Sequence, residues 1–341
     1  MTQSTLPPAT ESGVSASGGL PRPRRPRGIR GSLQQLLAFA SLILIVAFFS
    51  FMSPYFFTPI NIVSILTSAT VTGIIALGTT FVIITGGIDL SIGTGLVLCG
   101  VMCGVFLTYW GWPLWLGVLG AILFGGLMGT INGINVTFLK IPPFIATLVM
   151  MLVASGLSLV ISGTKPIYFK SQPDFQNIMN LSVIPGGIFP LGVLIFLFMM
   201  IVAWFLLSRT VIGRYAFAIG SNESATRLSG VNVTRWKITI YALAGLFVGL
   251  AGVLFSARLA SAQPTGGQGL ELQAIAAVVI GGTSLAGGKG SIVGTVIGSL
   301  VMAVLSNGLL IISVPQEWQS VAVGIVVLIA VYLDMLRRRR A

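Results

Sequence analysis

The chain has 341 residues, of which 55% are hydrophobic and only 8% are charged, and its mean hydropathy is +1.00. A soluble globular domain carries about 25% charged residues, so this composition excludes a soluble enzyme, a disulfide scaffold and a disordered protein. The apolar residues form long continuous blocks and do not alternate with polar ones, which excludes a transmembrane β-barrel. We therefore predict an all-α polytopic membrane protein.

The net charge of +12 comes largely from the two ends of the chain, which hold nine of the nineteen Lys and Arg residues. Basic clusters beside apolar spans are topology signals that stay on the cytoplasmic side, where anionic lipid also attracts them. A nucleic-acid surface would need basic and aromatic residues interleaved on a water-exposed face. The charge thus predicts contact with membrane lipid and no nucleic-acid partner.

The first segment, 1–30, is rich in Pro, Gly and Ser and has no hydrophobic periodicity, so we expect a disordered cytoplasmic tail. The apolar block that follows is too long for the core of a signal peptide and has no cleavage signal at its end. We therefore expect it to be a retained first span. The transmembrane domain is predicted over 31–336, followed by a basic cytoplasmic tail over 337–341.

A membrane span needs about 20 predominantly apolar residues. The eighth of the apolar segments is short and bounded by glycines, so it is expected to be broken or re-entrant. We predict about ten spans, over 33–53, 60–84, 91–110, 113–138, 143–163, 188–207, 238–259, 270–283, 290–312 and 317–336.

The loops between these spans divide the basic residues unequally. With the N-terminus inside, sixteen Lys and Arg residues fall on the inner side and three on the outer side. This asymmetry follows the positive-inside rule. It predicts an even number of spans with both termini in the cytoplasm.

The connection between the second and third spans reads TGGIDLSIG over 85–93 and contains Asp89, the only acidic or basic residue between Gly31 and Leu139. Asp89, followed by Ser91, suits the start of the next helix, so one hypothesis is a capping and loop-ordering role. An acid near membrane depth is also a functional candidate. A similar GGxxLxxG pattern recurs over 281–288, which hints at duplicated halves.

Two segments carry small residues at every fourth position. The first ladder is Ala121, Gly125, Gly129 and Gly133, and the second runs over 290–298 through Gly290, Gly294 and Gly298. Such ladders let helix backbones approach closely. They predict tight packing in the bundle or an interface between subunits.

The longest predicted inner loop, over 208–237, contains helix start and stop signals around one short amphipathic helix. A short helix that projects into the cytoplasm is a suitable docking element for a soluble partner; the alternative is a surface helix without a partner. The residues assigned to this docking role are Ser221, Asn222, Glu223, Ala225, Arg227, Leu228 and Gly230.

Mildly polar side chains inside the predicted spans either join helices by hydrogen bonds or line a path for a polar, uncharged solute. The near absence of charged residues there argues against an ion or an amino acid as the solute. The candidates for the path or its gate are Asp89, Ser91, Asn132, Asn135, Gln273 and Asn307.

No cofactor site is predicted on this chain. The loop over 283–290 superficially resembles a phosphate-binding loop, but it has Thr283 where the first Gly is required and Gly290 after Lys289. The chain has no His, and Cys99 and Cys103 are expected to be small apolar residues on one helix face. Without paired carboxylates or a Cys–His pair, a membrane enzyme is not supported.

Five strings occur together: TGGIDLSIG, GTINGINV, IPPFIATL, GRYAFAIGSNESATRLSGV and AIAAVVIGGTSLAGGKGSIVGTVIG. In this combination the chain resembles the permease subunits of bacterial ABC importers for monosaccharides, the ribose/xylose type. The resemblance covers nearly the whole chain from about residue 33 onward.

The resemblance implies a channel of two permease copies in the inner membrane. It also implies a cytoplasmic ATPase that uses ATP, and a periplasmic or extracellular sugar-binding protein. The family's coupling helix would correspond to Ser221–Gly230, and the transported solute would be a sugar such as ribose. The alternative is a secondary transporter of a small polar uncharged solute, which would usually need more intramembrane charge than this chain has.

Overall fold

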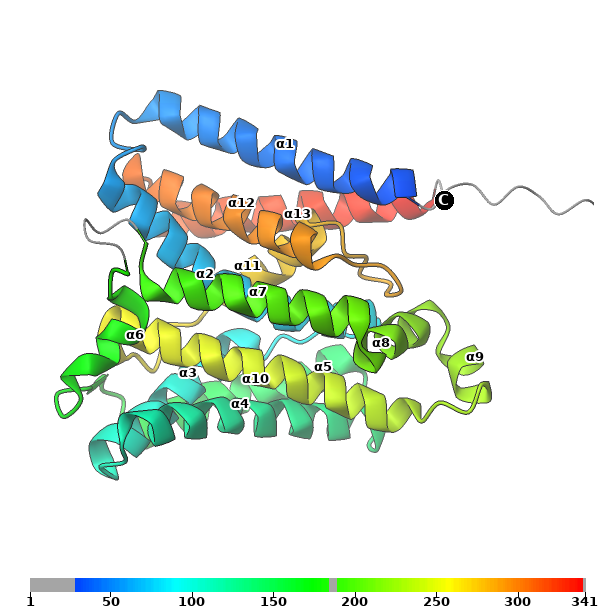
Figure 1. Ribbon diagram of the computed structural model, residues 1–341, viewed down its shortest axis with the longest axis horizontal. Helices are drawn as coiled ribbons and strands as arrows, with labels where there is room; N and C mark the ends of the chain where they lie inside the picture. Colours follow the sequence, from blue (N-terminus) through cyan, green and yellow to red (C-terminus); the bar gives the residue numbers. More distant parts are fainter. Residues whose placement is uncertain (1–27, 184–188, 340–341) are drawn as a thin grey trace, which may run out of the picture.

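The computed structural model describes residues 28–183 and 189–339, so residues 1–27 of the tail predicted over 1–30 lie outside that range. The chain is built almost entirely of helices packed lengthwise into one bundle (Figure 1). The first half contains α1 (Gly28–Met52), α2 (Pro59–Ile84), α3 (Ile92–Gly104), the π-helical η1 (Val105–Tyr109), α4 (Leu114–Thr137), α5 (Pro143–Ser162), β1 (Ile167–Tyr168), η2 (Pro173–Gln176) and α6 (Asn177–Asn180). The second half contains α7 (Leu191–Arg209), α8 (Val211–Ser221), α9 (Glu223–Leu228), α10 (Val233–Leu259), β2 (Ser261–Ala262), α11 (Leu270–Ile280), α12 (Ile292–Ile311) and α13 (Gln316–Arg339).

Every predicted span corresponds to a helix. Eight helices in the described ranges are long and apolar enough to cross a membrane, and the apolar parts of α1 and α11 are shorter. Proline starts several of them, as at Pro59 and Pro143, because its fixed φ suits the first helical turn. The fold class, an all-α polytopic membrane protein of about ten spans, is therefore confirmed.

Several boundaries differ from the predicted ones. Helix α1 begins at Gly28 and α13 continues to Arg339, so both extend into segments assigned to the tails. Within the predicted inner loop over 208–237, an additional amphipathic helix, α8, precedes α9. Helix α10 then begins at Val233, five residues before the predicted span.

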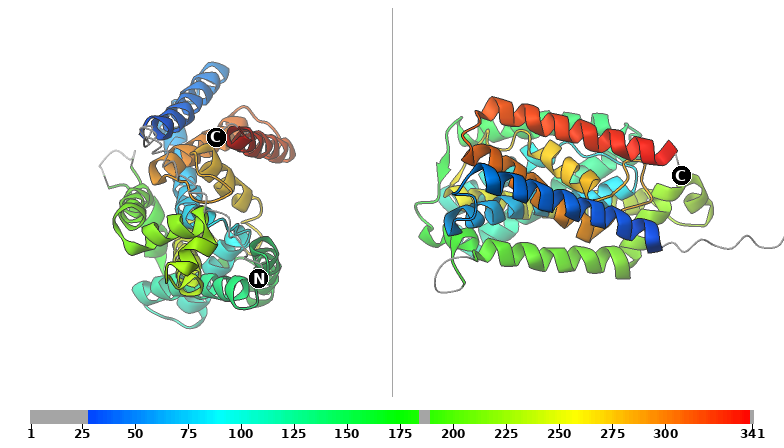
Figure 2. Two further views of the ribbon diagram at one scale, coloured as in Figure 1. Left: turned by 90° about the vertical axis from the view of Figure 1, so that its right-hand side faces the viewer. Right: turned by 90° about the horizontal axis from the view of Figure 1, so that it is seen from above.

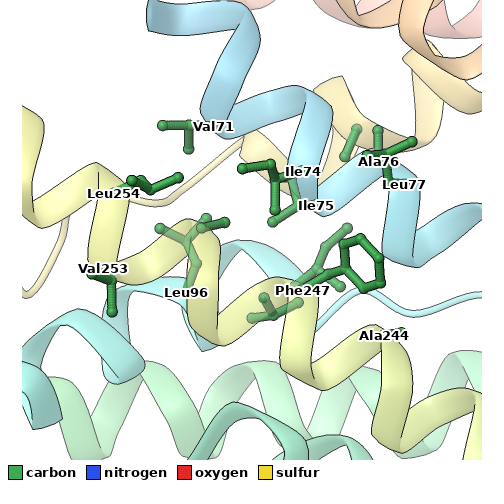
Figure 3. Packing of buried hydrophobic residues seen from close by; sticks show 14 of the residues in the cluster. Val71, Ile74, Ile75, Ala76, Leu77, Leu96, Ala244, Phe247, Val253 and Leu254 are labelled. Carbon is green, nitrogen blue, oxygen red and sulfur yellow. The ribbon is translucent and has the colours of Figure 1, made fainter. Parts of the chain in front are cut away.

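The core of the bundle lies where α2 and α10 pack together. Both helices are mostly buried, and α10 packs along α4 on its other side. Figure 3 shows Ile74 and Leu77 of α2 together with Phe247 of α10, and all three side chains are at most 1% exposed. Neighbouring helices surround most of α2 and α10, so neither helix needs the polar, water-facing side that a helix of a soluble protein has.

The outer helices present apolar side chains away from the core. Val160 of α5 and Leu328 of α13 are 77% and 69% exposed, and only a minor part of each of these helices is buried. Lipid is as apolar as these side chains, so such a surface is stable in a membrane and not in water. The chain is a multi-pass membrane protein.

The helix order places both ends of the described chain at one end of the bundle. The start of α1 and the end of α13 lie at the end that also carries α9, which is on the right in Figure 1 and nearest the viewer in the left view of Figure 2. The opposite end carries α6 and the antiparallel pair β1–β2, in which Ile167 faces Ala262. We call these the α9 end and the β end.

Candidate functional site

Helix α9 projects from its end of the bundle as a short, well-capped element (Figure 1). The Asn222 side-chain oxygen caps it by accepting a hydrogen bond from the N–H of Ala225 at 2.9 Å. The Arg227 guanidinium pairs with the Glu223 carboxylate at 3.0 Å, one helical turn away. The helix expected within 221–230 is therefore present over Glu223–Leu228.

Contacts with α10 and α8 hold α9 in place. The Lys237 ammonium of α10 donates to the second carboxylate oxygen of Glu223 at 2.6 Å. The Lys237 side chain is 17% exposed, so solvent screens this ion pair less than it screens a fully exposed pair. Thr226, on the inner side of α9, is buried. The helix is thus fixed to the bundle along one side only.

The free side of α9 carries the two apolar residues assigned to docking. Leu228 is 90% exposed and Ala225 is exposed as well. One exposed Leu is ordinary in a protein surface. Its position at the tip of a fixed, capped helix makes it an available contact for a partner.

The end of α8, which leads into α9, packs among glycines from three separate segments. Gly220 is in the last turn of α8, Gly86 follows α2, and Gly288 lies between α11 and α12. The Gly288 N–H donates to the carbonyl oxygen of Ile84 at 2.8 Å. A Cβ atom on Gly220 would collide with that same oxygen and would lie 2.6 Å from the Gly288 nitrogen. These backbones approach too closely for any side chain; we call this the glycine junction.

The two GGxxLxxG segments meet in this junction. Gly287 has φ +81°, which favours glycine, and a Cβ there would lie 2.9 Å from the nitrogen of Gly86. The repeated motif therefore marks two loops that contact each other and the end of α8. A displacement of α9 would act on both loops at once.

The Asp89 carboxylate orders the first of these loops. One of its oxygens accepts hydrogen bonds from the Ser91 N–H at 2.9 Å and from the Ser91 hydroxyl at 2.6 Å. Both bonds end at the residue before α3, so Asp89 orders the loop and does not cap the helix. Asp89 lies between the spans α2 and α3, where burial raises the pKa of its carboxyl and the bonds from Ser91 oppose that rise.

This loop is tied to two more helices. The Asn132 amide of α4 donates to the Ser91 hydroxyl oxygen at 2.9 Å, and the Leu90 N–H donates to the Thr147 hydroxyl of α5 at 3.1 Å. The structure thus joins three of the predicted path candidates, Asp89, Ser91 and Asn132, into one buried network. Thr147 and Tyr241, whose hydroxyl lies against Gly87, complete its surroundings.

The other predicted path candidates lie elsewhere. The Asn307 amide of α12 donates to the Ser64 hydroxyl of α2 at 3.4 Å, which is a bond between helices. Asn135 lies near the end of α4, where its backbone carbonyl oxygen accepts a hydrogen bond from the Ile141 N–H at 3.2 Å. Gln273 is in the first turn of α11 and is partly exposed.

The glycine ladders pack inside the bundle. On α4, Gly125 and Gly133 lie against the backbone of α10, where Cβ atoms would be 2.7 Å from Gly249 N and Ile238 Cα respectively. On α12, a Cβ on Gly294 would collide with the carbonyl oxygen of Gly281. Gly290 precedes α12 and packs against the Ile84 side chain, so it is not part of the helical ladder.

Three residues of these sites were not singled out from the sequence. Gly220 is an ordinary helix glycine by pattern, and its close approach to Ile84 depends on the fold. Tyr241 lies in an apolar run. Glu271 opens α11 and could have been noticed as an acid beside a predicted broken span.

The fold and these contacts define a polytopic membrane bundle whose two internal loops converge under one exposed helix. A model of the family described as branched-chain amino acid transport system / permease component matches residues 61–331. The chain therefore belongs to this family of transport permeases.

Several curated relatives are similar over nearly their whole length. The ribose import permease of Escherichia coli (strain K12) is 42% identical over 304 residues, which cover 89% of this chain and 94% of the relative. The ribose import permease of Bacillus subtilis (strain 168) is 43% identical over 307 residues, with coverage of 89% and 94%. The D-allose transport system permease of Escherichia coli (strain K12) is 40% identical over 299 residues, with coverage of 87% and 90%. No solved structure matches the chain.

The chain is accordingly the membrane component of a transport system and not an enzyme. The family assignment therefore favours this class over the alternative, a secondary transporter of a small polar uncharged solute.

Proposed function

We propose that the chain is the permease subunit of an ATP-driven importer that moves a monosaccharide such as ribose across the bacterial inner membrane. The observation that carries this proposal is the sequence identity of at least 40% to ribose and allose permeases over about nine-tenths of the chain. The polar but largely uncharged interior suits a neutral solute of this kind.

In this proposal the α9 end faces the cytoplasm. Lys140, Arg214, Arg227, Lys237 and Lys289 all belong to loops or helix ends on that side, as the positive-inside rule requires. The β end then faces the periplasm or the exterior, where a sugar-binding protein would deliver the substrate. A second copy of the permease would complete the channel.

The energy source is a separate cytoplasmic ATPase that docks on α9. Leu228 and Ala225 would enter an apolar groove of the ATPase, with Glu223 and Arg227 at the rim setting the orientation. Because the end of α8, which leads into α9, packs in the glycine junction, movement of the ATPase would reach both GGxxLxxG loops. This route supplies the coupling between ATP hydrolysis and opening of the path.

Leu228→Asp tests this docking. A charge placed in an apolar contact is costly, so we expect loss of co-purification with the ATPase and loss of ATP-driven ribose uptake in proteoliposomes. Leu228 is exposed, so the variant should fold and insert normally. Leu228→Met, which keeps an apolar side chain of similar volume, is the matched control and should transport normally. Normal uptake by Leu228→Asp would show that α9 is a surface helix without a partner.

A further inference from the structure

Helix α9 is joined to the bundle by the backbone at both of its ends and by one polar contact between side chains. In Figure 1, α10 begins next to α9 at the same end of the bundle. Among the described residues, the hydrogen bond from Lys237 of α10 to Glu223 at 2.6 Å is the only side-chain hydrogen bond between α9 and another helix. The other polar side chains of α9 bond within their own segment. The polar link between α9 and α10 therefore depends on Lys237.

The two cations that pair with Glu223 differ in burial. Arg227 is 65% exposed and lies one turn along the same helix, so solvent screens its ion pair, which contributes little to stability. The Lys237 side chain is largely withdrawn from water, and burial of an ammonium group is costly unless an acid is paired with it. Separation of Glu223 from Lys237 would leave that charge without its partner. The pair therefore favours movement of α9 and α10 together.

Lys237 lies one helical turn from a contact with the first GGxxLxxG loop. Residues four apart lie on the same face of a helix, so Lys237 and Tyr241 share one face of α10. The Tyr241 hydroxyl packs against Gly87, where a Cβ atom would lie 2.6 Å from its oxygen. Gly87 belongs to the loop that Asp89 orders. A displacement of Lys237 thus reaches this loop through one turn of α10.

This connection is distinct from the glycine junction. The junction reaches the loops from α8, through the backbone contacts of Gly220 with Ile84 and Gly288. The Lys237 connection reaches the first loop from α10, which also packs along α2 and α4. Helix α9 is therefore attached to the first loop by two routes that start from different helices.

We propose that the Lys237–Glu223 ion pair transmits movement of the docked α9 to α10 and so to the first GGxxLxxG loop, an inference that rests on the proposed function. Lys237 is then a positioning residue, because it acts through α9 and touches neither the sugar nor the ATPase. Docking uses the free side of α9, which carries Leu228 and Ala225, whereas transmission uses the side attached to α10. Mutation of Lys237 should therefore separate the two steps.

Substitutions of Lys237 give a graded test. Lys237→Met keeps an unbranched side chain and removes the ammonium group. Lys237→Arg keeps a cation that pairs with Glu223, and Lys237→Glu places a second carboxylate against the first. Arg235→Met is the matched control, because Arg235 is exposed on the same helix and makes no ion pair among the described residues.

The experiment uses the complete transporter in proteoliposomes, with ATPase and binding protein, and measures D-ribose uptake and ATP hydrolysis in the same sample. We expect Lys237→Met to lower the ribose taken up per ATP hydrolysed by about tenfold, which corresponds to the loss of one hydrogen bond between charged groups. Lys237→Glu should lower this ratio further, whereas Lys237→Arg and Arg235→Met should stay close to the wild type. Co-purification of the ATPase with Lys237→Met should be unchanged, which a defect in folding or docking would not allow.

The possible failures are distinct. An unchanged ratio in Lys237→Met and Lys237→Glu would overturn the transmission role and leave the proposed function standing. Loss of the ATPase from the Lys237→Met complex would also overturn it, because the residue would then act in docking. A ratio in Lys237→Arg as low as in Lys237→Met would show that the cation is not what matters. A wild-type complex that takes up no ribose with ATP and binding protein present would overturn the proposed function and this inference with it.

Discussion

Asp89 fulfils one part of the role that the sequence favoured. The expectation was a capping and loop-ordering residue, and the structure shows both hydrogen bonds going to Ser91, before the first turn of α3, so Asp89 orders the loop without capping the helix. The network then continues through Ser91 to Asn132 on α4. The residue therefore holds the loop that enters the glycine junction against the neighbouring helices.

This geometry predicts different outcomes for two substitutions of Asp89. Asn keeps an acceptor oxygen at the same position, so Asp89→Asn should retain a substantial part of ribose uptake. Asp89→Leu leaves two buried donors of Ser91 unpaired, at about 1–3 kcal/mol for each, and should lower the yield and melting temperature of the purified protein. A well-folded Asp89→Asn protein without uptake would show that the charge itself takes part in transport.

Among the elements, α12 packs closely against α11 through part of the second glycine ladder that the sequence pattern indicated. Gly294 has no space for a side chain because the carbonyl oxygen of Gly281 occupies the position of its Cβ. Small residues at such positions let two backbones touch where no hydrophobic effect drives helices together. The position of α11 depends on this contact.

Gly294→Leu should therefore separate α11 from α12. We expect a strong loss of folded protein in size-exclusion chromatography and no selective change in sugar preference, because overpacking acts on the whole contact. Gly324→Leu on α13 is the control, since a Cβ there meets no atom of the described chain within 4 Å. A fully active, well-expressed Gly294→Leu variant would contradict the close-packing interpretation.

At the scale of the whole molecule, the crossings bring both described chain ends to the α9 end (Figure 1). The cytoplasmic assignment of that end can be tested with an impermeant maleimide on intact cells. A cysteine at the exposed position Ser229, beside α9, should be protected, whereas one at Lys170, at the β end, should react. Permeabilisation is the control and should make Ser229→Cys reactive. Labelling of Ser229→Cys in intact cells would show that the α9 end faces outward and would contradict the proposed topology.

Fold class, span positions and the α9 helix were accessible from the sequence because each depends on local properties. A span is set by about 20 apolar residues in a row, and helix ends are set by Pro, Gly and capping side chains within a few positions. Asn222, Glu223 and Arg227 lie within one turn or two, so their pattern is visible in the chain itself. The same holds for the glycine ladders, whose spacing predicts close packing without naming the partner helix.

The tertiary structure alone decided which distant segments meet. Gly220, Ile84 and Gly288 are far apart in the chain, and each is unremarkable in its own segment. Likewise, Glu271 is an acid in the first turn of a short helix, and only the fold places its carboxylate against Gly93 of α3. Contacts between backbones depend on how helices pack against one another, and that packing is a property of the assembled bundle and not of any local stretch.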